Sequence, residues 1–202
     1  MGESQNGSLL LSEVSMTDYS RKFNTLDTNA LHAGSAEPNI EGAVIAPIFQ
    51  SANYLMGDEA TYDEVRYIRL SNSPNHSILQ ARLAVLESGE EAVVTASGMA
   101  AISSAILAHV GQGEHLLVQR TLYGGTQSLL DDDASRLGIE TDVIDIGDPQ
   151  GAAAWAEKLR PETRLIYVES ISNPLVEVGD LETVVAFARQ HGLVTVIDST
   201  FA

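Results

Sequence analysis

The sequence contains no cysteine among its 202 residues. It therefore has no disulfide framework, no thiolate nucleophile and no cysteine-based zinc site. No apolar run approaches the roughly 18 residues of a membrane-spanning helix, and the short apolar block 9–11 lacks the basic flank of a secretory signal. Basic residues are also scarce, since 11 Lys and Arg face 28 Asp and Glu, for a formal net charge of −17. This charge argues against nucleic-acid and anionic-membrane partners, and we expect a cytoplasmic protein.

Several familiar motifs are also missing. Gly111-Gln112-Gly113 begins a dinucleotide-binding pattern, but Leu116 occupies the position of its third glycine. There is no Gly-Lys-Ser/Thr run of a phosphate-binding loop, and Ser97 lacks the preceding glycine of a hydrolase nucleophile. The five histidines include no pair four residues apart, and the acidic run 131–133 is typical of a solvated helix face. We therefore expect no metal site.

The first third of the chain is irregular and the rest is periodic. Residues 1–24 are polar and aperiodic, as in a flexible arm, and residues 25–56 carry Gly and Pro among scattered apolar residues. Regular spacing starts at His76, where Leu79, Leu83 and Leu86 fall on one face of a helix that Gly89 would end. We expect one segment at 1–75 and an α/β domain at 76–202.

Strand and helix patterns alternate through this second part. The expected strands are apolar runs at 92–96, 115–119, 141–146, 164–169 and 194–197. The expected helices lie at 99–107, from the Tyr123-Gly124-Gly125 turn to about residue 137, at 150–159, and at 181–191 before Gly192. This alternation predicts a three-layer α/β/α fold with a mainly parallel sheet.

The stretch 91–107 combines a strand, a tight turn at Ser97-Gly98 and a helix. The first amides of such a helix have no carbonyl partner and can bind an anion, and Gly98 lets a phosphate approach the backbone closely. The alternative is an ordinary turn with Ser97 as helix N-cap. Taken alone, the stretch favours the ordinary turn.

Ligands of open parallel sheets bind beyond the carboxyl ends of the strands. The groups expected there are a helix start at 97–99, an aromatic ring at Tyr123, an amide at Asn173 beside a proline, and the carboxylate of Asp198. A phosphorylated heteroaromatic cofactor with a basic ring nitrogen would use all four. The carboxylate would pair with the protonated nitrogen, which is the device that makes pyridoxal phosphate an electron sink.

Seven motifs, in order along the chain, also resemble one family. The family is the pyridoxal-phosphate enzymes of cysteine and methionine metabolism, which includes cystathionine synthases and lyases, methionine γ-lyase and homoserine sulfhydrylases. The motifs are HAG from His32, GAVIAPIFQS from Gly42, YIR from Tyr67, ASGMAAI from Ala96, LYGGT from Leu122, YVESISNPL from Tyr167 and VIDSTFA from Val196.

The resemblance implies a role for each matching residue at the cofactor. Gly98 and Met99 would hold the phosphate through backbone amides. Tyr123 would stack on the ring and assist proton transfer, and is the one catalytic candidate. Asn173 would lie near the ring hydroxyl, and Asp198 would pair with the pyridinium nitrogen.

Two further residues would act across a subunit boundary. By resemblance, Tyr67 and Arg69 would reach the phosphate of a neighbouring subunit, so residues 1–75 would contact that subunit and the protein would be a homo-oligomer, a dimer of dimers. Taken singly, Tyr67 is equally a core aromatic, Arg69 a surface ion pair and Asp198 a cap.

The resemblance also implies what the chain does not supply. The family binds its cofactor covalently through a lysine in a Ser-x-Thr-Lys run that would follow Ala202, whereas the chain holds only Lys22 and Lys158. The implied function is elimination or replacement at Cβ or Cγ of a sulfur-containing amino acid, with these 202 residues inactive alone. Two alternatives stay open: an inactive homologue that associates with a full-length partner, and a nucleotide-binding α/β module.

Overall fold

The computed structural model describes residues 17–56, 61–148 and 151–202. Most of the predicted flexible arm therefore lies outside the described residues. The chain divides into two compact units, residues 1–94 and residues 95–202, and each is described by itself. The boundary between the units lies after the helix that begins at Pro74, whereas the expected boundary, between residues 75 and 76, falls inside this helix.

The first unit is built around two helices, α1 (Leu26–His32) and α2 (Pro74–Leu86). Three 3-10 turns accompany them: η1 (Ile40–Gly42), η2 (Tyr62–Glu64) and η3 (Ile68–Leu70). Just past α1, Gly34 has φ +69°, and a Cβ there would lie 2.7 Å from the backbone nitrogen of Arg82. The chain can lie this close to α2 because the residue is a glycine.

The predicted helix with Leu79 and Leu83 is confirmed as α2, although both leucines are exposed. Its C-terminus differs in detail from the expected glycine stop. Ser88 adopts the left-handed conformation with φ 54°, and Gly89 N donates to Ala84 O at 2.8 Å. The left-handed residue therefore precedes the glycine.

The second unit holds a four-stranded parallel sheet of order β2-β1-β3-β4. Its strands confirm four of the five expected ones to within one or two residues. They are β1 (His115–Gln119), β2 (Glu140–Ile144), β3 (Thr163–Glu169) and β4 (Val194–Asp198). The helices around them are α3 (Gly98–Leu107), α4 (Gly124–Ser128) with the π-helical η4 (Leu129–Ala134), α5 (Ala152–Ala156) and α6 (Leu181–His191).

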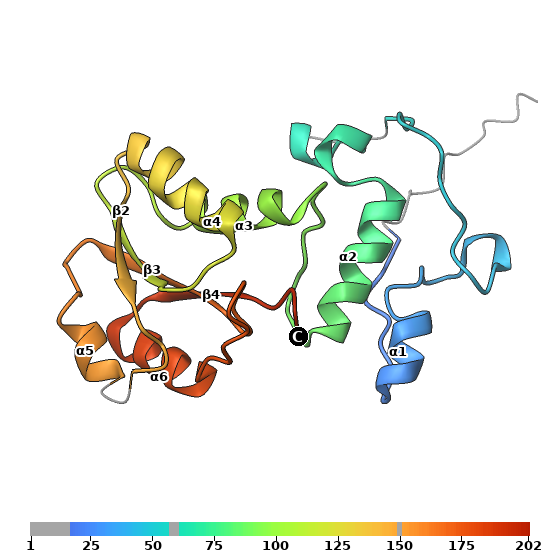
Figure 1. The fold of residues 1–202 in the computed structure, drawn as a ribbon. Helices are drawn as coiled ribbons and strands as arrows, with labels where there is room; N and C mark the ends of the chain where they lie inside the picture. Colours follow the sequence, from blue (N-terminus) through green and yellow to red (C-terminus); the bar gives the residue numbers. More distant parts are fainter. Residues whose placement is uncertain (1–16, 57–60, 149–150) are drawn as a thin grey trace, which may run out of the picture. The chain divides into compact units, whose positions relative to one another are not determined.

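Helices cover both faces of this sheet, as Figure 1 shows, with α3 and α4 on one side and α5 and α6 on the other. The alternation of side chains along the strands produces the two layers. Leu116 and Leu165 pack under α3 and η4, whereas Leu117 and Ile166 pack under α5 and α6. The second unit therefore has the predicted three-layer α/β/α architecture.

The strand expected at Ala92–Ala96 is wrong. These residues carry no strand pairing, and Val93 is exposed. A strand needs a neighbour for its backbone N–H and C=O groups, and no described residue provides one here. The helix expected at 150–159 is also shorter, since α5 covers only Ala152–Ala156 and its predicted start lies outside the described residues.

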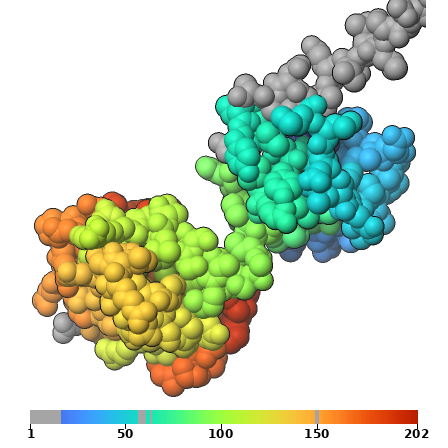
Figure 2. Space-filling model, turned by 90° about the horizontal axis from the view of Figure 1, so that it is seen from above, coloured from blue at the N-terminus to red at the C-terminus, as the bar shows by residue number. Residues whose placement is uncertain are grey.

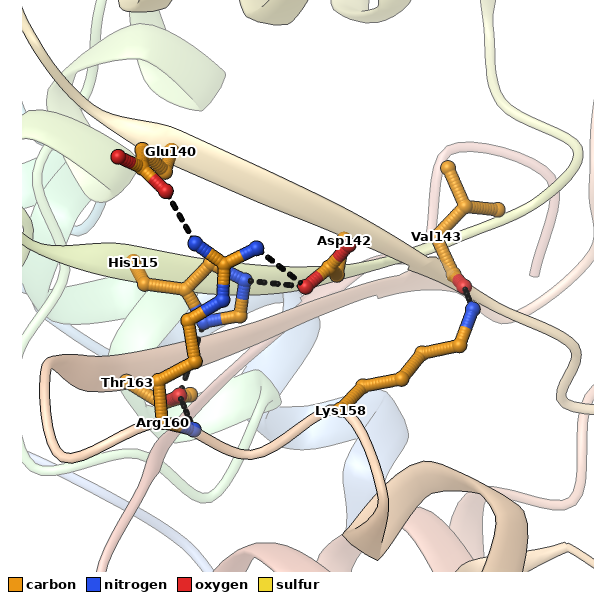
Figure 3. Close-up of polar contacts among 7 residues, drawn as sticks. All are labelled: His115, Glu140, Asp142, Val143, Lys158, Arg160 and Thr163. Atoms are coloured by element: carbon orange, nitrogen blue, oxygen red, sulfur yellow. Dashed lines mark hydrogen bonds and ion pairs between the residues drawn. The ribbon is translucent and has the colours of Figure 1, made fainter.

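A polar cluster closes the amino ends of the strands (Figure 3). Arg160 N donates to Thr163 Oγ1 at 2.9 Å, so the hydroxyl proton is free for His115 Nδ1, which lies 2.8 Å away. His115 Nε2 lies 3.3 Å from Asp142 Oδ2, but it has no hydrogen-bond partner among the described residues. The guanidinium of Arg160 bonds the carboxylates of both Asp142 and Glu140. Except for His115 Nε2, the cluster's side chains are therefore joined by hydrogen bonds among its own residues.

Burial and the guanidinium of Arg160 lower the pKa of His115, and the carboxylates of Asp142 and Glu140 only partly oppose them. None of the helices in the described part of the chain is long and apolar enough to cross a membrane.

The lowered pKa predicts pH-dependent stability. Between the folded pKa of His115 and its ordinary value of 6.5, the unfolded chain binds more protons than the folded one. The free energy of unfolding should therefore fall as the pH is lowered through this window, and His115 should contribute no slope above it.

Urea unfolding at a series of pH values measures this slope. His115→Gln should flatten it, whereas His109→Gln, at an exposed histidine, should not. Equal slopes in wild type and His115→Gln would contradict the assignment.

Candidate active site

The carboxyl ends of β1 and β3 diverge. The chain leaves β1 toward α4 on one face of the sheet, and leaves β3 toward α6 on the other. Ligands of open parallel sheets bind at such a reversal. The residues around the two exits are therefore the candidate site.

The start of α3 supplies backbone donors. Ser97 Oγ accepts a hydrogen bond from Ala100 N at 3.1 Å, so the interpretation of Ser97 as N-cap is confirmed. This cap satisfies the third amide of the helix, and helix geometry leaves the amides of Gly98 and Met99 to point outward. A Cβ at Gly98 would meet nothing within 4 Å. An anion can therefore approach this ten-residue helix directly.

The ring of Tyr123 lies beside that helix start. Tyr123 is 46% exposed and precedes α4. A Cβ on Gly125 would lie 2.6 Å from Tyr123 Cε1 and 3.0 Å from Met99 Sδ, so the glycine leaves room for both side chains. The structure thus brings together two residues that are 24 positions apart in sequence, at a single glycine.

Glu169 connects the two exits and was not among the expected site residues. It ends β3, and its side chain is only 3% exposed. Oε1 accepts from Tyr123 N at 2.7 Å, and Oε2 accepts from Asn173 N at 3.0 Å. The loops that carry Tyr123 and Asn173 therefore converge on one carboxylate. An acidic residue closing the apolar run RLIYV was the available sequence signal.

Asp198 lies at the end of β4, directly opposite Glu169 in the sheet register. Its Oδ1 accepts from Thr200 N at 3.0 Å, and its Oδ2 accepts from the hydroxyl of Tyr167 at 3.1 Å. Burial, with the nearby Asp198 charge, raises the pKa of Tyr167 well above its ordinary value. Tyr167 therefore remains a hydrogen-bond donor and orients the carboxylate.

Tyr67 and Arg69 belong to the first unit, where they lie together. The guanidinium of Arg69 bonds the Tyr67 hydroxyl and sits 5.4 Å from the centre of its ring. Asn72 holds this turn, since its Oδ1 accepts from Tyr67 N and its Nδ2 donates to Val65 O, both at 2.8 Å. Arg69 is exposed and Tyr67 is partly buried. That this pair reaches the phosphate of a neighbouring subunit stays a prediction.

Lys158, the lysine of the second unit, lies away from the exits of β1 and β3. Its ammonium donates to the carbonyl oxygen of Val143 on β2, the outer strand of the sheet (Figure 3). The candidate site residues follow β1, β3 and β4 instead. Lys158 is therefore not positioned to act there.

The comparisons with known proteins agree with the fold. A family model described as Cys/Met metabolism PLP-dependent enzyme matches residues 27–202. A probable cystathionine gamma-synthase of Herpetosiphon aurantiacus is 36% identical over 178 residues, which make up 87% of this chain and 53% of that protein.

Two solved structures are similar, each with a TM-score of 0.78 and with 89% of this chain and 45% of the other covered. One is a cystathionine gamma-lyase from Lactobacillus plantarum complexed with L-serine, at 29% identity. The other is a putative O-acetylhomoserine (thiol)-lyase from Campylobacter jejuni with N'-pyridoxyl-lysine-5'-monophosphate, at 30% identity. The chain spans about half the length of the proteins it matches. It belongs to the Cys/Met metabolism PLP-dependent enzyme family, whose cofactor is pyridoxal 5'-phosphate.

Proposed function

We propose that this chain forms the cofactor-binding part of an enzyme that eliminates or replaces a group at Cβ or Cγ of a sulfur-containing amino acid. One observation carries the proposal: a helix start, an aromatic ring and a carboxylate meet at the carboxyl edge of one parallel sheet. The donors fit pyridoxal phosphate, because the amides suit its phosphate and the carboxylate suits its ring nitrogen.

The chain's own residues would divide the work of binding. Gly98 and Met99 would bind the phosphate through their amides, with the space above Gly98 open to it. Asp198 would hold the ring nitrogen protonated, its carboxylate oriented by Tyr167. When bound, pyridoxal phosphate supplies an electron sink for charge that develops beside the amino group of the substrate.

Tyr123 and Asn173 would flank the ring. The half-exposed ring of Tyr123 supports its predicted roles in stacking and in proton transfer. Asn173 would donate to the ring hydroxyl. The similar proteins carry different reaction names, synthase, γ-lyase and thiol-lyase, so the proposal covers elimination and replacement on one class of small-molecule substrate.

The proposal includes a homo-oligomer, a dimer of dimers, in which Tyr67 and Arg69 complete the site of a neighbouring subunit. Exposed apolar side chains in the first unit support it, among them Ile45 at 82% and Leu55 at 99% exposure. Figure 2 shows this light-blue to cyan part of the chain on the visible face of the first unit. Arg69 would add a bidentate phosphate donor to a strongly acidic chain.

These 202 residues alone are proposed to be inactive, since neither Lys22 nor Lys158 matches the lysine to which the family attaches its cofactor. Under the alternative, an inactive homologue, the chain would act only by association with a full-length partner. Turnover of cystathionine or methionine by the purified chain would contradict this part of the proposal.

Substitution of Asp198 tests cofactor recognition. Pyridoxamine 5'-phosphate is the probe, because it lacks the aldehyde that reacts with lysines. Asp198→Ala should weaken its binding, measured by calorimetry, about 10- to 100-fold, which corresponds to the loss of roughly 1.5–3 kcal/mol for a charged hydrogen bond. Asp131→Ala, at an exposed aspartate of η4, is the control. Binding of ADP that survives Asp198→Ala, without binding of the pyridine probe, would favour the nucleotide-binding alternative.

Gly125→Ala tests the position of the Tyr123 ring. The added Cβ would collide with the far ends of two side chains, Tyr123 and Met99, so the fold should persist while the ring moves. Affinity for pyridoxamine 5'-phosphate should fall about 3- to 10-fold, the effect of losing an aromatic contact of roughly 0.5–1.5 kcal/mol. Gly124→Ala is the matched control, because its Cβ would meet nothing within 4 Å. Equal affinities in the two variants would rule out the assigned stacking role.

A further inference from the structure

Glu169 occupies an unusual position for an acidic side chain. It is almost fully buried at the end of β3, and its two oxygens accept hydrogen bonds from backbone amides of two different loops. Burying a carboxylate is costly unless its oxygens are hydrogen-bonded. The two loops must therefore present their amides to Glu169 for this side chain to remain inside.

The hydrogen bonds around Glu169 begin where the backbone pairing of β1 with β3 stops. The register of β1 with β3 runs as far as Val118 and Tyr167. Beyond this pair the link is made by a side chain: Gln119 Oε1 accepts a hydrogen bond from Glu169 N at 2.9 Å. Gln119 is 2% exposed. Side chains thus continue the link between the strands at the point where the strands separate.

One carboxylate consequently limits how far the two loops can move apart. Tyr123 N and Asn173 N each lie within 3.0 Å of an oxygen of the same group. The residues at these two amides are the ones expected to stack on the cofactor ring and to bond its hydroxyl. Any change in the Glu169 bonds would alter the space between them.

We propose that Glu169 is a positioning residue, which sets the separation of Tyr123 and Asn173 and so the width of the slot for the cofactor ring. The inference rests on the proposed function. Glu169 touches neither the cofactor nor the substrate in this proposal, and acts through the two backbone amides. The phosphate cradle at Gly98 and Met99 lies on α3 and is not bonded to Glu169, so the slot and the cradle should respond differently to its substitution.

Glu169→Gln separates the two responses. The substitution keeps the size of the side chain but replaces one acceptor oxygen with an NH₂ group, which would face a backbone N–H and lose one of the two bonds. Glu114→Gln is the matched control. Glu114 also accepts from a backbone amide, Gly111 N at 2.9 Å, but at the amino end of β1.

The experiment measures three quantities on the wild-type chain and both variants: affinity for pyridoxamine 5'-phosphate, affinity for inorganic phosphate, and the induced circular dichroism of the bound pyridine ring. Glu169→Gln should weaken pyridoxamine 5'-phosphate binding about 10-fold, the scale of one lost hydrogen bond to a charged group, and change the circular dichroism. Its affinity for inorganic phosphate should match wild type. Glu114→Gln should match wild type in all three.

Two results would overturn the inference alone: unchanged pyridoxamine 5'-phosphate affinity and circular dichroism in Glu169→Gln, or an equal loss of both affinities, which a general structural role would produce. Failure of the wild-type chain to bind pyridoxamine 5'-phosphate would instead overturn the proposed function. If Glu169→Gln does not fold, Glu169→Asp replaces it. The shorter acid keeps the charge but does not span both amides, and should show the same split between the two affinities.

Discussion

A carboxylate inside a protein must have its oxygens hydrogen-bonded, and the second unit meets this requirement for Glu169 with the backbone of two loops. The loop after β1 and the loop after β3 each contribute one amide. These loops leave the sheet toward opposite faces, so their positions are otherwise set by different helices. The separation of these two loops, which carry Tyr123 and Asn173, therefore depends on this single side chain.

Polar groups have different surroundings at the two ends of the strands. At the amino ends, hydrogen bonds join His115, Thr163, Arg160 and Asp142 in one cluster. At the carboxyl ends, backbone amides of two loops donate hydrogen bonds to the buried carboxylate of Glu169. The helix start and the ring of Tyr123 face outward there. The proposed cofactor site therefore lies at the edge of the sheet opposite to this cluster, where ligands of parallel sheets bind.

Much of this fold could be predicted from the sequence because its signals are local. Apolar runs such as His115–Gln119 and the stop at Gly192 identify strands and helices without knowledge of their neighbours. The run at Ala92–Ala96 carries the same signal, yet strand formation depends on a distant partner that local pattern does not reveal. Glu169 was missed for a similar reason. One of its partners is a backbone amide 46 positions away, and every residue except proline has such an amide, so the residue type at that position does not indicate the bond. Asp198 and Tyr123 could be proposed because ring and charge chemistry is carried by the side chains themselves. Their cofactor roles, and those of Tyr67 and Arg69, remain predictions.

The central claim is that Glu169 holds both exits, and amide hydrogen exchange followed by NMR tests it most directly. The Tyr123 and Asn173 amides lie in loops, where exchange is usually fast. If both are bonded to a buried carboxylate, they should exchange as slowly as the amides of β1 and β3, and far more slowly than that of Leu175, an exposed residue of the same loop as Asn173. Exchange of Tyr123 and Asn173 at the rate of Leu175 would contradict the account, because the loops would then move independently of the carboxylate.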